Sequence, residues 1–162
     1  MTTIVASVPQ RLMAADTNIV VGEARFRASK IQRINGALVA TSGDYDTGEI
    51  FIAWLSAGAS LDDKKALKRL MSTDEEHDFG ALVLTPEGEL LHYCSPFPSS
   101  VSDPYFAIGS GAAAALASIA TMQRLGVFVD VPLAVEMACE VDPNSRGPVE
   151  VLLLNNKPKR SR

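Results

Sequence analysis

The order of strand-like and helix-like segments is the feature of this sequence that most restricts its fold. Up to residue 43 the chain contains only strand patterns, at 3–8, 11–15, 18–21, 30–34 and 37–41. The dipeptide Asn35-Gly36, which separates the last two segments, is typical of a two-residue hairpin turn. Two helical segments, a hairpin, two more helical segments and a last strand follow. This segregation favours an α+β domain in which two sheets lie between helix layers.

The central helices are predicted from capping residues and from the spacing of apolar side chains. Asp46 and Glu49 have the spacing of a capping pair, so a helix is expected to begin there and to end before Gly58. Its predicted inward face carries Ile50, Trp54 and Ala57. A second helix is predicted over 61–71, with its lysines and arginine in water.

The second half of the chain contains a hairpin, a strand, two helices and a last strand. They are predicted over 81–84 with 89–93, 105–108, 112–125, 132–139 and 149–154, and the proline- and serine-rich segment 95–104 is expected to be a loop. The helix over 112–125 is apolar nearly all round, so we expect both of its sides to be covered. We expect one domain over 1–155 and a basic, disordered tail over 156–162.

Charge and composition exclude several classes of protein. A net charge of −4 argues against nucleic acid or an acidic membrane as the main partner. Cys94 and Cys139 form no CxxC pattern, and His77 and His92 are isolated, so we expect reduced thiols and no metal site. We also expect no cofactor. The apolar stretch 112–122 is too short to span a bilayer, and no secretory signal pattern is present. These features predict a cytoplasmic protein.

A glycine-rich turn at 109–114 is the sharpest local motif. It reads Gly-Ser-Gly-Ala-Ala-Ala between a predicted strand and helix, and Asp130 follows Gly109 by 21 residues. A dinucleotide-binding βαβ unit shows this pattern. Such a unit normally opens its domain, however, and only 32 residues follow Asp130. The alternative is that the glycines permit a tight turn and that Asp130 caps the next helix.

The beginning of the chain, Met1-Thr2-Thr3, offers a different kind of site. Removal of Met1 before a small residue would leave Thr2 as the terminal residue. A terminal threonine carries a hydroxyl nucleophile and an α-amine whose unperturbed pKa is about 7.7–8.0. That amine can accept the hydroxyl proton near neutral pH, so one residue supplies both nucleophile and base. The same residues also fit an ordinary polar start to a first strand.

Five more polar residues lie at the ends of predicted elements: Asp16, Lys30, Ser110, Asp142 and Ser145. Together with Thr2, their order resembles the proteasome β-subunit family of N-terminal-nucleophile hydrolases. The likeness is greatest to bacterial members that begin Thr-Thr-Ile-Val directly after Met. It covers nearly the whole chain, from Thr2 to Leu154. The resemblance implies a four-layer αββα sandwich, self-assembly into a homo-oligomeric ring and a threonine-type peptidase.

The resemblance also implies a role for each residue. Thr2 matches the nucleophile, and Lys30 matches a buried lysine whose charge favours the deprotonated hydroxyl and depresses the pKa of the amine. Asp16 matches the carboxylate that pairs with this lysine and compensates its buried charge. Three residues match the groups that hydrogen-bond around the amine and the threonine: Ser110, Asp142 and Ser145. No histidine base is required.

The segment after the Lys30 hairpin departs from the family pattern. Family members place a glycine there, whose backbone N–H helps to form the oxyanion hole. Residues 39–43 read Val-Ala-Thr-Ser-Gly, with no glycine at the expected spacing. The backbone N–H of Ala40 or of Gly43 is left for this role.

Alternative functions remain open at this point. Each matching residue, taken alone, also fits a strand end, a surface charge or a turn. The leading interpretation is a peptidase that acts on peptides or unfolded proteins, with an ATP-dependent unfoldase as a possible partner. The alternative is a catalytically silent scaffold of the same fold, or a nucleotide-binding module that uses the glycine-rich turn. A different amide substrate is a third option, since fold alone does not set the substrate.

Overall fold

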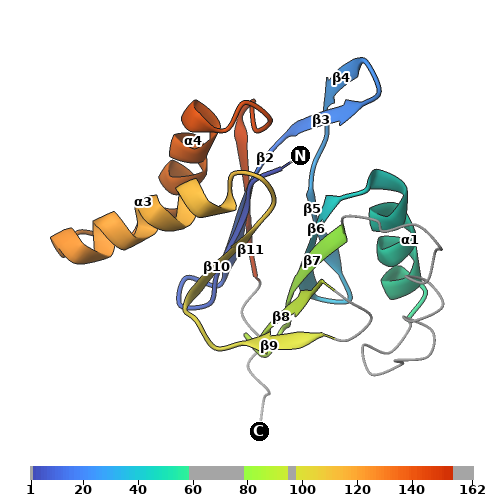
Figure 1. The fold of residues 1–162 in the computed structure, drawn as a ribbon. Coiled ribbons are helices and arrows are strands. Elements are labelled where there is room, and N and C mark those ends of the chain that lie inside the picture. The colour runs from blue at the N-terminus through green and yellow to red at the C-terminus, as the bar shows by residue number, and fades with distance from the viewer. Residues whose placement is uncertain (1, 59–78, 95–97, 155–162) are drawn as a thin grey trace, which may run out of the picture.

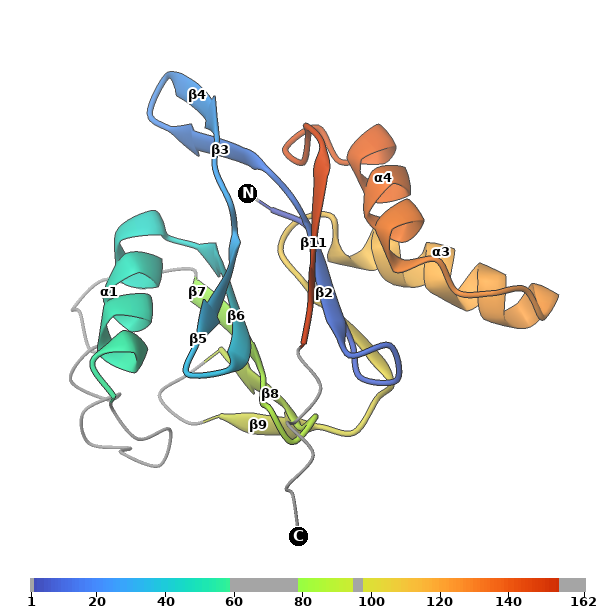
Figure 2. The ribbon, with the colours of Figure 1, turned by 180° about the vertical axis from the view of Figure 1, so that it is seen from behind.

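Two antiparallel sheets lie face to face between helices in the computed structural model, which describes residues 2–58, 79–94 and 98–154 (Figure 1). Helices α3 (Ala112–Leu125) and α4 (Val131–Val141) cover the outer face of one sheet. Helix α1 (Tyr45–Ser56) covers the outer face of the other sheet. Figure 2 shows the same layers from behind. The predicted α+β, αββα sandwich is confirmed.

The first sheet has the strand order β10-β1-β2-β11, with every neighbouring pair antiparallel. Its strands are β10 (Tyr105–Ile108), β1 (Ile4–Ser7), β2 (Leu12–Asp16) and β11 (Val149–Leu153). Every residue of β1 and β2 is buried, because Ile4 packs toward the second sheet and Val5 packs toward the helices. Burial on both faces explains why these strands are apolar without alternation. The predicted hairpin of buried strands is confirmed.

The second sheet has the order β5-β6-β7-β8-β9, and all its pairs are antiparallel. Its strands are β5 (Ile31–Ile34), β6 (Ala37–Gly43), β7 (Phe79–Leu84), β8 (Leu90–Tyr93) and β9 (Ser99–Val101). Asn35 and Gly36 both have positive φ, at 50° and 84°, as a two-residue hairpin turn requires. The prediction of a loop over 95–104 is corrected at residues 99–101, which form strand β9 and pair with β8.

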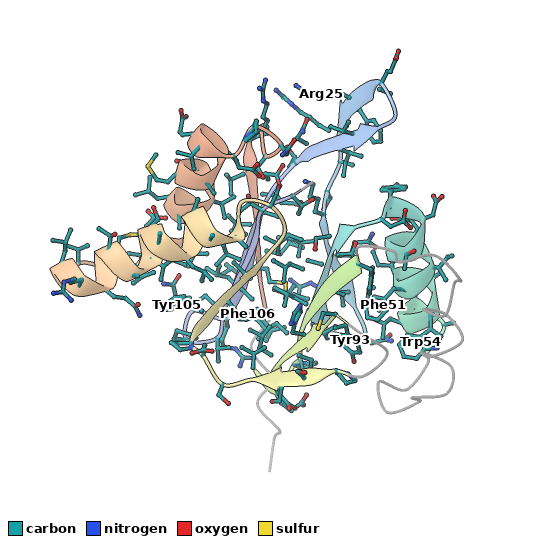
Figure 3. The ribbon with its side chains drawn as sticks, in the orientation of Figure 1. Arg25, Phe51, Trp54, Tyr93, Tyr105 and Phe106 are labelled. Atoms are coloured by element: carbon teal, nitrogen blue, oxygen red, sulfur yellow. The ribbon has the colours of Figure 1, made fainter. Side chains whose placement is uncertain are left out.

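Helix α1 begins earlier than predicted, and of its predicted inward face (Ile50, Trp54 and Ala57) only Trp54 packs against the core. Asp44, rather than Asp46, caps it by accepting a hydrogen bond from Thr47 N at 2.8 Å. Its buried face consists of Gly48, Phe51, Ile52 and Leu55, whereas Ile50 is 51% exposed. Phe51 packs against Phe79 and Tyr93, with ring centroids 5.5 and 5.1 Å apart, and these contacts select the buried face (Figure 3).

Helix α3 is covered on one side only, which corrects the prediction that both sides are covered. Ala115 and Ile119 are its buried residues, and Leu125 is 71% exposed. The apolar character of the outer side comes mainly from alanines, which favour a helix whether or not they are buried. None of the helices in the described part of the chain is both long and apolar enough to cross a membrane. The predicted helix over 61–71 and the tail over 156–162 lie outside the described residues.

The chain between β2 and β5 forms a hairpin of two short strands, which projects beyond the sandwich (Figures 1 and 3). Strand β3 (Asn18–Val21), which was predicted, pairs with β4 (Ala24–Arg27), which was not. All four residues of β4 are exposed, and the alternation of Ala24 and Phe26 with two arginines is too short to have marked it as a strand. After this hairpin the chain passes through residues 28–30, so Lys30 lies between β4 and β5.

Candidate active site

The structure brings all six predicted site residues into one hydrogen-bonded group. These residues lie at the ends of different elements: Thr2 before β1, Asp16 at the end of β2, Lys30 before β5, Ser110 after β10, and Asp142 and Ser145 between α4 and β11. Strand ends from both sheets and the ends of two helices therefore meet at Thr2. Tertiary folding, rather than proximity in sequence, assembles this group.

Lys30 connects the Thr2 hydroxyl to a buried carboxylate. Its Nζ donates to Thr2 Oγ1 at 2.9 Å and to Asp16 Oδ1 at 2.8 Å. Thr2 is 5%, Lys30 6% and Asp16 0% exposed. Burial lowers the pKa of Lys30 below its ordinary value, while the hydrogen bond and the charge of Asp16 act in the opposite direction. The lysine is thus a positive group held at the hydroxyl, and the buried Asp16 carboxylate compensates its charge.

The carboxylate of Asp16 is held in place by backbone donors as well as by Lys30. Its Oδ1 accepts from Thr3 N at 2.8 Å, and its Oδ2 accepts from Asn18 N at 3.1 Å and Arg146 N at 3.2 Å. A fully buried carboxylate needs such partners, since an unsatisfied buried charge is costly. These bonds fix the oxygen to which Lys30 is anchored.

A chain of hydroxyl groups leads from the Thr2 nitrogen to Asp142. Thr2 N donates to Ser110 Oγ at 3.3 Å, and Ser110 Oγ donates to Asp142 Oδ2 at 2.6 Å. Ser145 Oγ also donates to Asp142 Oδ2, at 2.6 Å, and lies 2.7 Å from Thr3 Oγ1. Because each serine gives its only proton to the carboxylate, Ser110 offers a lone pair to the Thr2 nitrogen and Ser145 offers one to Thr3.

Asp142 is expected to make stability depend on pH. Partial burial raises its pKa, but hydrogen bonds from Ser110, Ser145 and Asn144 outweigh this effect and hold the pKa below its ordinary value of 3.8. A depressed carboxyl pKa contributes stability above pH 3.8 that is lost as pH falls through the folded-state pKa. Asp142→Asn should therefore lower the free energy of unfolding by about 1–3 kcal/mol at pH 7, and by less as the pH falls below 4. Urea unfolding from pH 3 to 7 measures this; a deficit independent of pH would contradict it.

The glycines of the 109–111 turn are required by the N-terminal segment that lies against them. A Cβ atom at Gly109 would lie 2.0 Å from Thr2 O, and one at Gly111 would lie 1.9 Å from Thr3 Oγ1. Gly111 N donates to Thr2 O at 3.3 Å. Thus the turn positions the backbone on both sides of the Thr2 hydroxyl.

The interpretation of this motif as a dinucleotide site has no matching architecture in the described residues. Strand β10 pairs antiparallel with β1, whereas a βαβ unit needs a parallel strand. Asp130 caps α4 by accepting from Leu133 N at 3.0 Å, as the alternative interpretation predicted. The tight turn and the helix cap account for the pattern.

Gly109→Ala is expected to disrupt the site through the Thr2 backbone. Gly109 has φ +92°, so the substitution adds backbone strain to the contact with Thr2 O, and we expect a loss of about 3 kcal/mol or more in stability. Gly126→Ala is the matched control: Gly126 also has positive φ, +68°, but no atom lies within 4 Å of its Cβ position, so strain alone should cost about 1–2 kcal/mol. Denaturant unfolding compares the two. Equal losses would show that the contact with Thr2 has no effect.

Two cavities open at Thr2. One, of about 60 Å³, includes Lys30 and Tyr45 in its lining; the other, of about 620 Å³, includes Phe79 and His92. Burial lowers the pKa of His92, whose ring lies 5.0 Å from that of Phe106. Of the two, only the larger cavity has room for a bound side chain beside Thr2.

The backbone at 42–43 lies beside Thr2, whereas Ala40 does not. Ser42 and Gly43 line both cavities. Ala40 is fully buried and is paired with Ile31 and Leu82 on either side, so its backbone groups belong to the sheet. Of the two oxyanion-hole candidates, Gly43 is the one at the cavities, and sequence reasoning missed its neighbour Ser42.

Sequence reasoning also missed Thr3, Asn18 and Glu150. Thr3 is fully buried against Ser145, and Asn18 Nδ2 donates to Asn144 O at 3.1 Å. Glu150 contacts the segment that carries Lys30. The sequence signal that could have indicated Glu150 is its place as the single acidic residue within the otherwise apolar stretch 149–154. Within the described residues, no group of three or more His, Cys, Asp or Glu side chains is placed to hold a metal ion.

Comparison with known proteins shows similarity in structure rather than in sequence. No family model matches the chain, and no match was found among curated proteins. Thiobacillus denitrificans BPH, in complex with epoxomicin, superposes with a TM-score of 0.72 at 20% identity, over 95% of this chain and 100% of that chain. The chain has the proteasome-type αββα fold.

Two further structures with this fold agree. HslV from Trypanosoma brucei gives a TM-score of 0.70 at 21% identity, over 93% of this chain and 98% of that chain. Anbu, an ancestral beta-subunit, from Yersinia bercovieri gives a TM-score of 0.69 at 11% identity, over 94% of this chain and 80% of that chain. Identities this low establish the fold alone, so an activity has to be argued from the residues of this chain.

Proposed function

We propose that this protein is a threonine-type peptidase of the proteasome-type fold, in which Thr2 becomes the N-terminal nucleophile once Met1 is removed. The observation that carries the proposal is the position of Lys30 Nζ, 2.9 Å from Thr2 Oγ1 and 2.8 Å from the buried Asp16 carboxylate. A surface lysine or a strand-end aspartate does not need this arrangement. An activated hydroxyl does.

The first half of the reaction forms an ester on Thr2. The free α-amine of Thr2 accepts the hydroxyl proton, and Oγ1 attacks the carbonyl carbon of the scissile peptide bond. Lys30 stabilises negative charge on Oγ1, and the backbone N–H groups at Ser42 and Gly43 are the candidates for donors to the oxyanion. The amine then gives its proton to the leaving nitrogen as the C–N bond breaks.

The second half releases the product. Water attacks the ester carbonyl, the Thr2 amine takes the proton from the water, and Oγ1 leaves with a proton returned from that amine. In both halves of the reaction Ser110 and Asp142 orient the Thr2 nitrogen, by the hydrogen bonds of 3.3 Å from Thr2 N to Ser110 and of 2.6 Å from Ser110 to Asp142. Neither histidine of the chain has a part in this scheme.

Peptides and unfolded proteins are the proposed substrates, and a homo-oligomeric ring in the cytoplasm is the proposed assembly. Leu125, Phe128 and Val141, on or beside α3 and α4, are 71%, 78% and 70% exposed, and contacts between subunits would cover such apolar side chains. Cys94 and Cys139 are free cysteines, which suits a reducing compartment. An ATP-dependent unfoldase is the proposed partner for folded substrates, whereas short peptides need none.

Peptide hydrolysis by protein of known N-terminal mass tests the proposal. Protein without Met1 should hydrolyse fluorogenic peptides in the absence of ATP. A chain with one extra residue kept in front of Thr2 is the control and should be inactive, because its nitrogen is an amide rather than an amine. If the protein without Met1 has no activity and a threonine-directed inhibitor adds no mass, the chain is a catalytically silent scaffold.

A further inference from the structure

Glu150 lies where the edges of the two sheets face each other. It belongs to β11, the edge strand of the first sheet, and pairs with Ala15, next to Asp16. Strand β5 is the edge of the second sheet, and Lys30 immediately precedes it. The Glu150 side chain crosses from one edge to the other.

The carboxylate of Glu150 binds three consecutive residues around Lys30. Its Oε1 accepts from the backbone N–H of Lys30 and from that of Ile31, the latter at 3.1 Å. Its Oε2 lies 2.6 Å from the Ser29 hydroxyl, which is also 2.8 Å from Ile31 O. One side chain thereby fixes the backbone from which the Lys30 side chain departs.

This contact restrains the backbone of Lys30, which few other elements in the described residues hold in place. Upstream of Ser29 the chain comes from the projecting β3–β4 hairpin, which packs little against the sandwich (Figure 1). The regular pairing of β5 begins only at Ile31. The N–H groups of an edge strand have no strand partner on one side, so another group has to bind them. At Lys30 and Ile31 that group is Glu150.

We propose that Glu150 is a positioning residue, which holds the 29–31 backbone so that Lys30 Nζ reaches both Thr2 Oγ1 and Asp16. Its catalytic meaning rests on the proposed function, because Lys30 matters for reaction only if Thr2 is the nucleophile. The contact itself does not depend on that function. Glu150 is not among the residues that line the two cavities at Thr2, so it should influence turnover rather than substrate binding.

Glu150 also acts on Lys30 through its charge. Among the titratable groups that act on Lys30 are Asp16 on β2, Glu150 on β11 and Cys139 on α4. The negative charge of Glu150 raises the pKa of Lys30, against the larger lowering by burial. Position and charge are separable, because glutamine keeps an oxygen acceptor for the two N–H groups and removes the charge.

Three variants separate a positioning role from a general effect on the sheet edges. Glu150→Ala removes both contact and charge, and Glu150→Gln removes the charge alone. Arg33→Ala is the matched control, since Arg33 Nη2 donates to Leu153 O at 2.6 Å and is a second link between β5 and β11. Peptide hydrolysis is measured for each, with kcat and KM obtained separately.

Glu150→Ala should lower kcat about 10- to 100-fold and change KM less than about threefold, because a misplaced catalytic group slows reaction without weakening binding. Glu150→Gln should restore kcat to within about fivefold of wild type, and Arg33→Ala should leave it unchanged. The proposal is overturned if Glu150→Ala keeps wild-type kcat, if Gln is as harmful as Ala, or if Arg33→Ala is equally harmful.

NMR titration of lysine side chains separates this proposal from the proposed function. The Lys30 resonance is identified by its loss in Lys30→Arg. Its pKa should fall in Glu150→Ala and Glu150→Gln and stay unchanged in Arg33→Ala, whether or not the protein hydrolyses peptides. An inactive wild type with this pattern would refute the peptidase and keep the electrostatic effect of Glu150 on Lys30. An active wild type whose Lys30 pKa ignores Glu150 would refute the effect of the Glu150 charge, and the kinetics of Glu150→Ala and Glu150→Gln would then decide the positioning role.

Discussion

Thr2→Ala is expected to reduce peptide hydrolysis about 10³-fold or more, because it removes the only atom that can form the acyl-enzyme in the proposed reaction. The Thr2 side chain is 5% exposed and its hydroxyl bonds to Lys30, so a modest loss of stability should accompany the change. Steady-state hydrolysis of a fluorogenic peptide, with circular dichroism on the same samples, measures both effects.

Thr2→Ser is the matched control for this substitution. Serine keeps the hydroxyl and the terminal amine and deletes a methyl group, so activity should remain within about tenfold of wild type. Comparable hydrolysis by wild type and Thr2→Ala would show that Thr2 is not the nucleophile. Loss of activity in both variants, with intact folding, would show that more than the hydroxyl is required.

Lys30→Met is expected to have the second largest effect, on activity and on stability together. It removes the positive group 2.9 Å from Thr2 Oγ1, and loss of one such electrostatic partner costs about 10²- to 10³-fold in kcat. It also leaves Asp16, which is 0% exposed, without its cation, and an uncompensated buried charge costs about 3 kcal/mol or more.

The double variant Asp16→Asn/Lys30→Met separates these two effects. Neutralising both partners removes the buried charge, so part of the lost stability should return, although the new amide NH2 faces a backbone N–H that the carboxylate had accepted. The value of kcat should stay as low as in Lys30→Met. Denaturant unfolding and peptide hydrolysis on the four proteins of the cycle give the coupling. Recovery of activity in the double variant would contradict a catalytic role for Lys30.

The fold followed from sequence where the signal was local. Asn35-Gly36 specified a turn with two positive φ values, and the continuous apolar character of 4–6 and 12–15 indicated strands buried on both faces. Strands β4 and β9 were missed because they are only four and three residues long and lie mostly exposed, so neither carries an extended apolar pattern. They are strands because a neighbouring strand pairs with them.

The helix faces depended on partners that are distant in sequence. The stretch that forms α1 has two apolar stripes, and contacts of Phe51 with Phe79 and Tyr93 decide which is buried. The alanine-rich composition of α3 does not reveal whether its outer side is covered. Hydrophobic periodicity identifies a helix, whereas the choice of its buried face is made by packing.

The site was predictable as a set of residues but not as a geometry. Thr2, Asp16 and Lys30 were selected by their order along the chain, and the structure adds the distances that make them one group. Thr3 and Glu150 gave no motif, because each acts through contacts with segments more than 100 residues away. Such contacts exist only after both sheets have formed.

The most direct test of the central claim is the location of a covalent inhibitor on the chain. The purified protein is incubated with epoxomicin, the compound bound in the similar BPH structure, and is then analysed by intact mass and by peptide mapping. The proposal predicts one inhibitor per chain, on the peptide that begins at Thr2, in molecules that have lost Met1, and none in Thr2→Ala. Peptide hydrolysis by molecules that retain Met1 and take up no inhibitor would contradict it.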